Sequence, residues 1–194
     1  MESELEAIPV EYRDQLDEVV VSEQDIHYKI AELGAQITGD YQGKQPILIG
    51  VLKGASVFLA DLSRKIHLPL RFDFIAVSSY GSATKTSGIV RILKDLDHEI
   101  EDQDVIVVED IIDSGLTLNY LLRYLRARRP RSVEVCALFY KEGRQRVEIP
   151  VKYEGFRIGP EFVVGYGLDY QERFRNLPFL AVLADHPETR NARR

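Results

Sequence analysis

The chain has 194 residues and is 45% hydrophobic, which suits one globular domain with a core of ordinary size. Its formal net charge of -6 argues against non-specific binding to nucleic acid, so we expect no nucleic-acid partner. The single cysteine, Cys136, excludes a disulfide framework and favours a buried thiol in a reducing compartment. No apolar run approaches the roughly 20 residues of a membrane span, and the acidic first residues do not resemble a secretion signal. We therefore expect a cytoplasmic protein without a membrane partner.

The first fifty residues predict a short edge strand, a helix and a buried strand. The edge strand is predicted over 16–21. Ser22 and Asp25 have the spacing of a capping box, and the helix that follows should end near Gly39. Its predicted inner face consists of Ile26, Ile30, Leu33 and Ile37. The apolar run 47–52 predicts the buried strand, and Lys53 and Gly54 follow it directly, where an anion could bind before the next helix.

The next segment predicts a strand, a polar loop and a returning strand. Apolar residues alternate with polar ones at Leu70, Phe72, Phe74 and Ala76, which predicts a strand with that face on the core. The stretch 79–88 is small and polar and has no periodicity, as in a hairpin loop or an active-site lid. A strand should return over 89–93. The acidic residues 95–102 are interpreted as solvated surface.

The centre of the chain predicts a strand, a loop and a helix. The β-branched run 105–108 is typical of a strand buried on both faces, and it ends in two acids, Glu109 and Asp110. An amphipathic helix follows, with its inner face at Leu118, Leu121, Leu122 and Leu125. The loop between them, 113–117, is rich in small and hydroxyl residues, and helix N-termini attract anions. The pattern predicts a phosphate-binding loop.

Ordinary helix capping by Asp113 is the alternative for this loop, since Ser, Thr, Asp and Gly are common at helix starts. A buried strand that ends in adjacent acids is less ordinary, because carboxylates near a core need a partner or a metal. The acids and the loop together therefore favour a ligand site.

The last third of the chain brings further charged residues to predicted strand ends. A strand over 133–139 leads to Lys141, while Arg144 and Arg146 are interpreted as surface charges. The structure of 147–159 is not predictable from its composition. A short strand over 162–164 precedes a glycine-rich segment that carries Asp169 and Arg175. A closing strand is predicted over 179–183, and the tail 187–194 is expected to be disordered.

The alternation of strands and helices predicts an α/β fold with a twisted, mainly parallel sheet flanked by helices. We expect one domain over 1–194, with a core of roughly 22–165. A small hood formed from the termini, the N-terminal segment and roughly 166–185, should cover the active edge.

The segment Val107–Leu118 closely resembles the phosphoribosyl-diphosphate signature of the type I phosphoribosyltransferases, and within them the hypoxanthine-guanine phosphoribosyltransferases. The resemblance extends to 52–54, 79–81, Lys141 and 162–170, so it covers roughly residues 15 to 185. It implies purine salvage. The phosphoribosyl group of 5-phosphoribosyl 1-diphosphate would pass to N9 of hypoxanthine or guanine, giving IMP or GMP and pyrophosphate. It also implies Mg²⁺ as cofactor and assembly as a homodimer or homotetramer.

The resemblance also implies a role for each matched residue. Asp113 would be the general base, and a cis peptide bond would precede Lys53. Ribose and 5′-phosphate would be bound by Glu109, Asp110, Asp113, Ser114, Gly115, Leu116 and Thr117. Pyrophosphate would be bound by Lys53, Gly54 and Arg175, and the purine by Lys141, Phe162, Val163 and Asp169. The metal would be held by Glu109, Asp110 and Asp169, and the lid would carry Ser79 and Tyr80.

Two other functions fit the same sequence features. One is a related phosphoribosyltransferase that prefers xanthine or another base. The other is a non-enzymatic, nucleotide-sensing regulator on the same fold that binds RNA. The acidic balance disfavours the regulator, and the joint presence of Asp113, Lys141, Asp169 and Arg175 favours catalysis.

Overall fold

The computed structural model describes residues 5, 8–79 and 90–192. Tyr80 and the rest of the expected lid therefore lie outside the described residues, and Ser79 is the last residue of strand β3. Among the helices of the described residues, none is long and apolar enough to cross a membrane.

The larger sheet has six strands in the order β4-β3-β2-β5-β6-β7. All neighbouring pairs are parallel except β3 and β4, which confirms the predicted mainly parallel sheet. In chain order the strands are β2 (Ile47–Leu52), β3 (Arg71–Ser79), β4 (Val90–Lys94), β5 (Asp104–Ile112), β6 (Ser132–Lys141) and β7 (Tyr153–Ile158).

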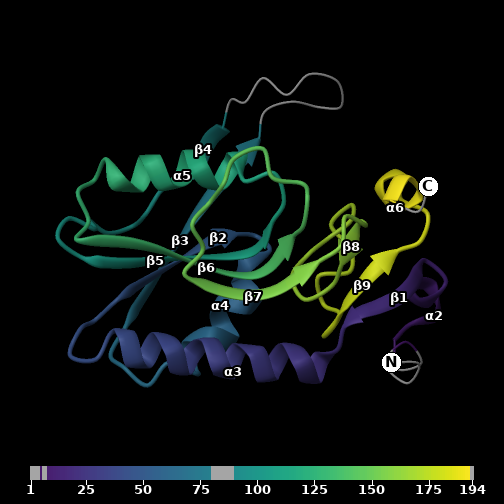
Figure 1. The fold of residues 1–194 in the computed structure, drawn as a ribbon, viewed down its shortest axis with the longest axis horizontal. Helices are drawn as coiled ribbons and strands as arrows, with labels where there is room; N and C mark the ends of the chain where they lie inside the picture. Colours follow the sequence, from purple (N-terminus) through teal and green to yellow (C-terminus); the bar gives the residue numbers. More distant parts are fainter. Residues whose placement is uncertain (1–4, 6–7, 80–89, 193–194) are drawn as a thin grey trace.

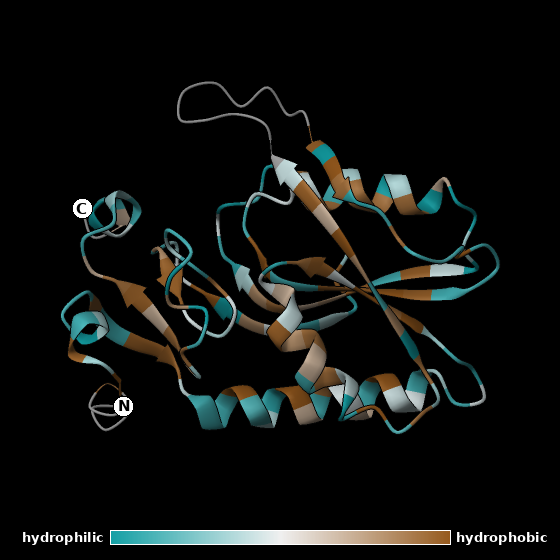
Figure 2. Ribbon diagram, turned by 180° about the vertical axis from the view of Figure 1, so that it is seen from behind, coloured by the Kyte–Doolittle hydropathy of each residue, from teal (hydrophilic) through white to brown (hydrophobic). Residues whose placement is uncertain are grey.

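Helices cover both faces of this sheet (Figure 1). Helix α5 (Leu116–Arg126) lies on one face, and its four predicted inner leucines are buried there. Helices α3 (Glu23–Asp40) and α4 (Ala55–Ser63) lie on the other face, where the predicted inner residues of α3 are also buried. The side chain of Ser22 accepts a hydrogen bond from the Asp25 backbone N–H, as the capping box predicted. In Figure 2 the strands between these helices are largely hydrophobic.

A smaller antiparallel sheet, together with both ends of the chain, forms the hood (Figure 1). Its strand order is β1-β9-β8, from β1 (Leu16–Val21), β9 (Leu180–Leu183) and β8 (Val163–Val164). It has a core of its own, which includes Phe174 and Phe179. Helix α2 (Val10–Arg13) precedes β1. Strand β8 pairs with β9 in the hood sheet, while the Val163 side chain packs in the core cluster that contains the inner residues of α3 and α4.

The predicted burial of strand β3 is wrong at its start. Asp73 and Ile75 are buried, whereas Phe72 is 55% exposed. An inner strand of a sheet can be covered on either face, and alternation alone does not say which face is covered. Ile75 packs in the cluster that contains the α5 leucines, and the Asp73 carboxylate accepts hydrogen bonds from the Phe74 and Asp97 backbone N–H groups.

The expected disorder of the tail is also wrong for residues 187–192, which form helix α6 (Pro187–Ala192). Thr189, in this helix, is only 1% exposed. Its hydroxyl donates to the Leu183 carbonyl at 2.9 Å and accepts from the Phe162 backbone N–H at 3.3 Å. The polar composition of the tail suggested solvent, but these two hydrogen bonds hold the helix against the hood.

Candidate active site

The carboxyl ends of strands β2, β5 and β6 meet at one edge of the sheet, beside the hood (Figure 1). Lys53 follows β2, Asp113 follows β5, and Lys141 is the last residue of β6. Because parallel strands deliver their ends to the same edge, residues far apart in sequence meet there. The peptide bond between Leu52 and Lys53 is cis, as the resemblance implied.

The two acids of β5 lie inside this edge. Glu109 is 8% exposed, and Gly54 packs so closely on Asp110 that a Cβ at residue 54 would lie 1.6 Å from Oδ2 of Asp110. Burial raises the pKa of Glu109 well above its ordinary value, and the neighbouring Asp110 raises it further. Burial likewise raises the pKa of Asp110 to about 6. Two adjacent carboxyl groups with raised pKa values, one buried and one partly buried, form a place where a cation or a hydroxyl-rich ligand would be favoured.

The loop after β5 has the shape of an anion cradle. Gly115, at φ +76°, is the N-cap of α5 and has no side chain to cap it, while the Ser114 hydroxyl accepts a hydrogen bond from the Leu116 backbone N–H at 3.5 Å. Capping by Asp113, the alternative explanation of the loop, is therefore not what the structure contains. A cavity of about 230 Å³ opens here. Its lining residues are Glu109, Ile111, Ile112, Asp113, Ser114, Gly115, Thr117 and Leu118. The N–H groups of the first helical turn have no acceptor within the helix, so the cradle offers donors to an anion.

A second cavity of about 180 Å³ shares Ile111 and Asp113 with the first. It brings together residues of β5, β6 and the hood, namely Asp110, Ile111, Asp113, Lys141, Phe162, Val163, Leu168, Asp169 and Arg175. The buried Lys141 Nζ lies 4.0 Å from Asp113 Oδ2 and 5.7 Å from the centre of the Phe162 ring. A flat polar ring would find an aromatic face, an aliphatic face from Ile111 and an ammonium donor in this space.

Arg175 joins this cavity to the lysine that follows β2. Its guanidinium lies 2.7 Å from Asp169 Oδ1 and 3.5 Å from Glu172 Oε2, and it donates to the Gly167 carbonyl at 2.8 Å. The same Glu172 oxygen accepts a hydrogen bond from Lys53 Nζ at 2.9 Å. One carboxylate thus bridges the two cations that the sequence assigned to pyrophosphate.

The structure adds residues that sequence reasoning missed or misassigned. Arg144, interpreted as a surface charge, lies 3.3 Å from Asp113 Oδ1 and 2.9 Å from Glu188 Oε1, so that interpretation is wrong. Glu188 also lies 3.5 Å from Lys141 Nζ. Glu172 could have been found from its place between Asp169 and Arg175. Glu188 and His186 gave no signal, because a polar tail does not reveal what it packs against.

The acidic residues do not form a closed metal cage. Within the described part of the chain, no three His, Cys, Asp or Glu side chains converge on one point. Asp169 is held by Arg175. Glu109 is buried and Asp110 partly buried, and desolvation raises the pKa of both, although Arg175 partly offsets the rise for Asp110. This donor set fits a magnesium ion that arrives on a phosphate ligand, because Mg²⁺ keeps water and takes only one or two carboxylates in such sites.

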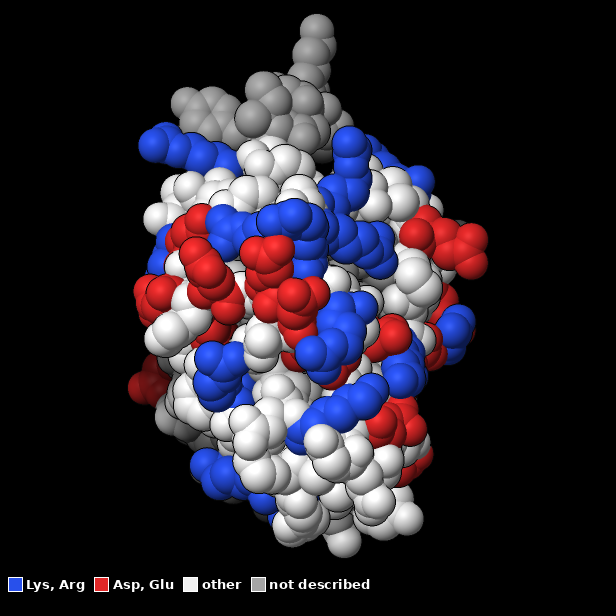
Figure 3. Space-filling model, turned by 90° about the vertical axis from the view of Figure 1, so that its left-hand side faces the viewer, with Lys and Arg blue, Asp and Glu red and all other residues white. Residues whose placement is uncertain are grey.

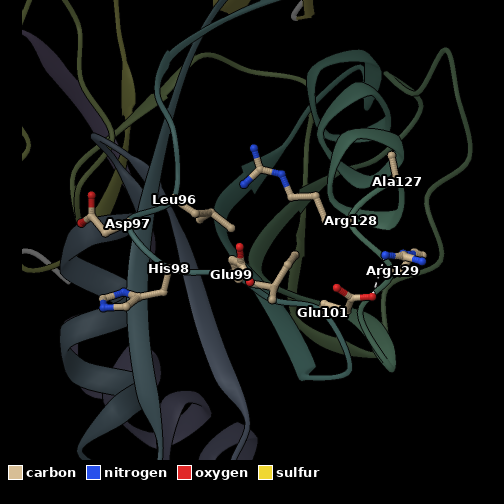
Figure 4. Close-up of a pocket in the computed structure, with 9 residues that line it drawn as sticks. Leu96, Asp97, His98, Glu99, Glu101, Ala127, Arg128 and Arg129 are labelled. Atoms are coloured by element: carbon tan, nitrogen blue, oxygen red, sulfur yellow. Dashed lines mark ion pairs between the residues drawn. The ribbon is translucent and has the colours of Figure 1, made fainter.

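A larger cavity, of about 430 Å³, lies at the amino ends of the strands, between the segments that precede β5 and β6 (Figure 4). Arg129 pairs with Glu101 across this cavity at 2.7 Å, and Arg128 pairs with Asp95 just outside it at 2.5 Å. Positive and negative side chains are interspersed over the surface there (Figure 3). None of the predicted site residues lines this cavity.

A family model, the phosphoribosyl transferase domain, matches residues 20–171. The hypoxanthine-guanine phosphoribosyltransferase of Mycobacterium avium is 49% identical over 178 residues, covering 89% of this chain and 88% of that protein. The Bacillus subtilis enzyme of the same name is 47% identical over 171 residues, covering 88% and 95%. A crystal structure of a hypoxanthine phosphoribosyltransferase from Staphylococcus aureus superposes with a TM-score of 0.87 at 44% identity, covering 91% and 96%.

The family model spans all six strands of the larger sheet and the cradle cavity at its carboxyl edge. The chain therefore belongs to the phosphoribosyltransferase family, among the hypoxanthine-guanine phosphoribosyltransferases.

Proposed function

We propose that the chain transfers the phosphoribosyl group of 5-phosphoribosyl 1-diphosphate to N9 of hypoxanthine or guanine in purine salvage, forming IMP or GMP and releasing pyrophosphate. The observation that carries the proposal is the pair of adjoining cavities, which share Asp113. One offers an anion cradle and the other an aromatic and ammonium-lined slot. A nucleoside monophosphate needs a site for its phosphate and a site for its base, side by side.

The slot suits a 6-oxopurine. The ring of Phe162 would stack on the base from the hood side and Ile111 would contact the opposite face, while the Val163 backbone would read the base edge. The Lys141 ammonium donates hydrogen bonds and accepts none, so it pairs with O6 of hypoxanthine or guanine and opposes the amino group of adenine.

The cradle and the acids suit the ribose phosphate. Ser114, Gly115, Leu116 and Thr117 would surround the 5′-phosphate at the start of α5, and Glu109 and Asp110 would hold the ribose hydroxyls. Lys53, Gly54 and Arg175 would receive the pyrophosphate. A magnesium ion held by Glu109, Asp110 and Asp169 would neutralise the charge that develops on the departing pyrophosphate.

Asp113 would take the proton of the purine ring. It lies between the two cavities, and Lys141 and Arg144 are its charged neighbours. A carboxylate at this point can accept a proton from the base while the cradle fixes the ribose, so that the reacting atoms are oriented before the glycosidic bond forms.

The decisive experiment is a pyrophosphate-release assay with hypoxanthine, guanine, xanthine and adenine, run on the wild type and on Lys141→Gln. We expect turnover with the 6-oxopurines and little with adenine, since a mismatched buried polar group can cost roughly 10⁴-fold in discrimination. In Lys141→Gln the 6-oxopurine values of kcat/KM should fall steeply and the ratio to adenine should shrink. An unchanged ratio would remove Lys141 from the base site. Turnover confined to xanthine would redirect the proposal to that base, and no turnover with any base would refute it.

We also propose that the chain works in the cytoplasm as a single-domain homodimer or homotetramer. Its cysteine is a buried free thiol, which suits a reducing compartment. Phe72 on β3 and Leu93 on β4 are large apolar side chains that are 55% and 62% exposed, and a second copy would cover them. Light scattering on the purified protein would measure the mass, and a monomer at micromolar concentration would refute assembly.

A further inference from the structure

The C-terminal segment Asp185–Ala192 contacts two residues of the proposed purine slot, Phe162 and Lys141, and also their neighbour Arg144. The His186 ring is stacked on Phe162, with centroids 3.8 Å apart and planes inclined by 27°. The backbone of Phe162 is tied to the same segment through the hydroxyl of Thr189. Glu188 reaches both Lys141 and Arg144. The segment therefore contacts both the aromatic residue and the cationic residue that are proposed to bind the base.

We propose that this segment is a working part of the purine site, in which His186 supports the Phe162 ring and Glu188 is the fixed counter-ion of Lys141 and Arg144. The inference rests on the proposed function, because it assumes that Phe162 and Lys141 bind the base. Both are positioning roles, since neither side chain lines the slot.

His186 covers the face of Phe162 that points away from the slot. Phe162 lines the slot, whereas His186 lines a separate cavity of about 90 Å³ with Gln15, Tyr170, Leu183 and Asp185. Tyr170 packs edge-on against both rings. A stacking residue is useful only if its ring is held still, because ordering it on binding costs affinity. The stack with His186 fixes the ring before the base arrives.

Glu188 completes the charge balance of the slot. Lys141 is 4% exposed, and a buried ammonium needs a nearby carboxylate. Asp113 is one such neighbour, but a general base becomes neutral when it takes the purine proton. Glu188 does not line the slot and takes no part in that proton transfer. Two cations, Lys141 and Arg144, therefore retain one carboxylate while the base is being joined to the ribose.

The sharpest test compares two ligands that differ only in the base. GMP occupies the slot and the cradle, whereas ribose 5-phosphate occupies the cradle alone. Calorimetric binding of each ligand should be measured for wild type, His186→Ala, His186→Phe and Glu188→Gln. Arg190→Ala is the matched control, because Arg190 lies on the same helix and pairs only with the exposed Asp185 among the described residues.

For His186→Ala and Glu188→Gln we expect GMP to bind about 5- to 10-fold more weakly, in line with the loss of one aromatic or charged contact, and ribose 5-phosphate to bind as in wild type. In steady state the KM for guanine should rise while the KM for the diphosphate donor stays within about twofold. His186→Phe should restore GMP binding, since it keeps a flat ring behind Phe162. The Arg190→Ala variant should match wild type.

Equal weakening of GMP and ribose 5-phosphate would overturn the inference, because the segment would then act only through the stability of the fold. GMP binding within twofold of wild type in both variants would overturn it as well. If wild type turns over guanine and Lys141→Gln does not, the proposed function stands whatever these variants show. If wild type itself neither binds GMP nor turns over guanine, the proposed function fails.

Discussion

The two ends of the six-stranded sheet both carry charged cavities, yet their charges are arranged differently. At the amino end, arginines meet acids at the protein surface, as Arg128 and Tyr124 meet Asp95 and Arg129 meets Glu101. At the carboxyl end, Glu109 is buried, Asp110 is partly buried beneath Gly54, and the pKa values of both are raised. The amino-end cavity is the larger of the two compared, at about 430 Å³ against about 180 Å³. Carboxyl groups with raised pKa values therefore mark the site better than cavity size does.

The comparison shows that the carboxyl groups with raised pKa values lie where a bound ligand could stabilise their charged form. The ion pairs at the amino end, Arg128 with Asp95 and Arg129 with Glu101, contribute to stability. Unpaired acids at the carboxyl end cost stability, and a cation brought by a substrate would recover that cost. The predictions below separate the two ends by asking which changes affect turnover and which affect unfolding.

Removing divalent metal should have the largest effect. In excess chelator we expect turnover to fall by roughly 10³-fold or more, because a metal supplies several kcal/mol of charge stabilisation in such reactions. The melting temperature of the substrate-free protein should not change, since no three metal-binding side chains converge in the described residues. Added Mg²⁺ should restore activity. Full turnover in chelator would show that the buried acids serve some other purpose.

Asp113→Asn should lower kcat by about 10²- to 10⁴-fold, the usual range for one acid-base group. The helix start should survive, because the N-cap of α5 is Gly115 and not Asp113. Donor binding should change less than kcat. Steady-state kinetics and a thermal melt measure the two effects separately, and an unchanged kcat with a collapsed melting temperature would assign Asp113 to the fold alone.

Most residues at the carboxyl end of the sheet could be predicted because the sequence patterns that indicate them are local. Adjacent residues predict these elements. A β-branched run that ends in Glu109 and Asp110 predicts the strand, and a glycine before an amphipathic pattern predicts the helix start. Parallel pairing then brings the ends of β2, β5 and β6 together without further information. The elements and most of the site were predictable for that reason.

The misassigned residues depend on contacts between distant segments. The local sequence does not distinguish Arg144 from an ordinary loop arginine. Its partners Asp113 and Glu188 are 31 and 44 positions away in the chain. Phe72 follows a correct alternation, but the pattern cannot say which face of β3 is covered. The polar tail forms α6 because Thr189 finds partners at Leu183 and Phe162. No local pattern encodes these partners.

Asp95→Asn should test the amino end by lowering stability without lowering turnover. Burial alone would raise the pKa of Asp95, but hydrogen bonds from Arg128 and Tyr124 outweigh it and hold the pKa below its ordinary value. The partly exposed contacts should be worth about 1 kcal/mol of unfolding free energy. We expect kcat/KM to stay within twofold of wild type. A loss of activity at unchanged stability would break the contrast between the two ends.

The pH dependence of that difference has a definite sign. A carboxyl group whose pKa is lowered on folding contributes its stability above the unfolded pKa and loses it as the pH falls through the folded pKa. The gap in unfolding free energy between wild type and Asp95→Asn should therefore be full at pH 7 and shrink below about pH 4. Urea unfolding at a series of pH values would measure it, and a gap that widened in acid would contradict the assignment.

Glu172→Gln should give the smallest effect, and it acts at the carboxyl end. Glu172 bridges Lys53 and Arg175, the two cations proposed for pyrophosphate, and its contact with Lys53 is exposed to solvent. The hydrogen bond from Lys53 lowers the pKa of Glu172, so the carboxylate is charged at neutral pH. Pyrophosphate must compete with this carboxylate for both cations. Removing the charge should tighten pyrophosphate binding by about two- to fivefold, the size of an exposed ion pair.

Product inhibition by pyrophosphate measures the effect of Glu172→Gln directly, and Glu154→Gln is the matched control. Glu154 pairs with Arg157 on strand β7, so it removes an ion pair of the same kind outside the two site cavities. The inhibition constant should fall in Glu172→Gln and not in Glu154→Gln, and the shift should shrink at high salt because exposed charges are screened. Weaker inhibition in Glu172→Gln would mean that the carboxylate orients the two cations for pyrophosphate more than it competes for them. Glu172 would then belong with the groups that prepare the site, and the strain at this end of the sheet would lie in Glu109 and Asp110 alone.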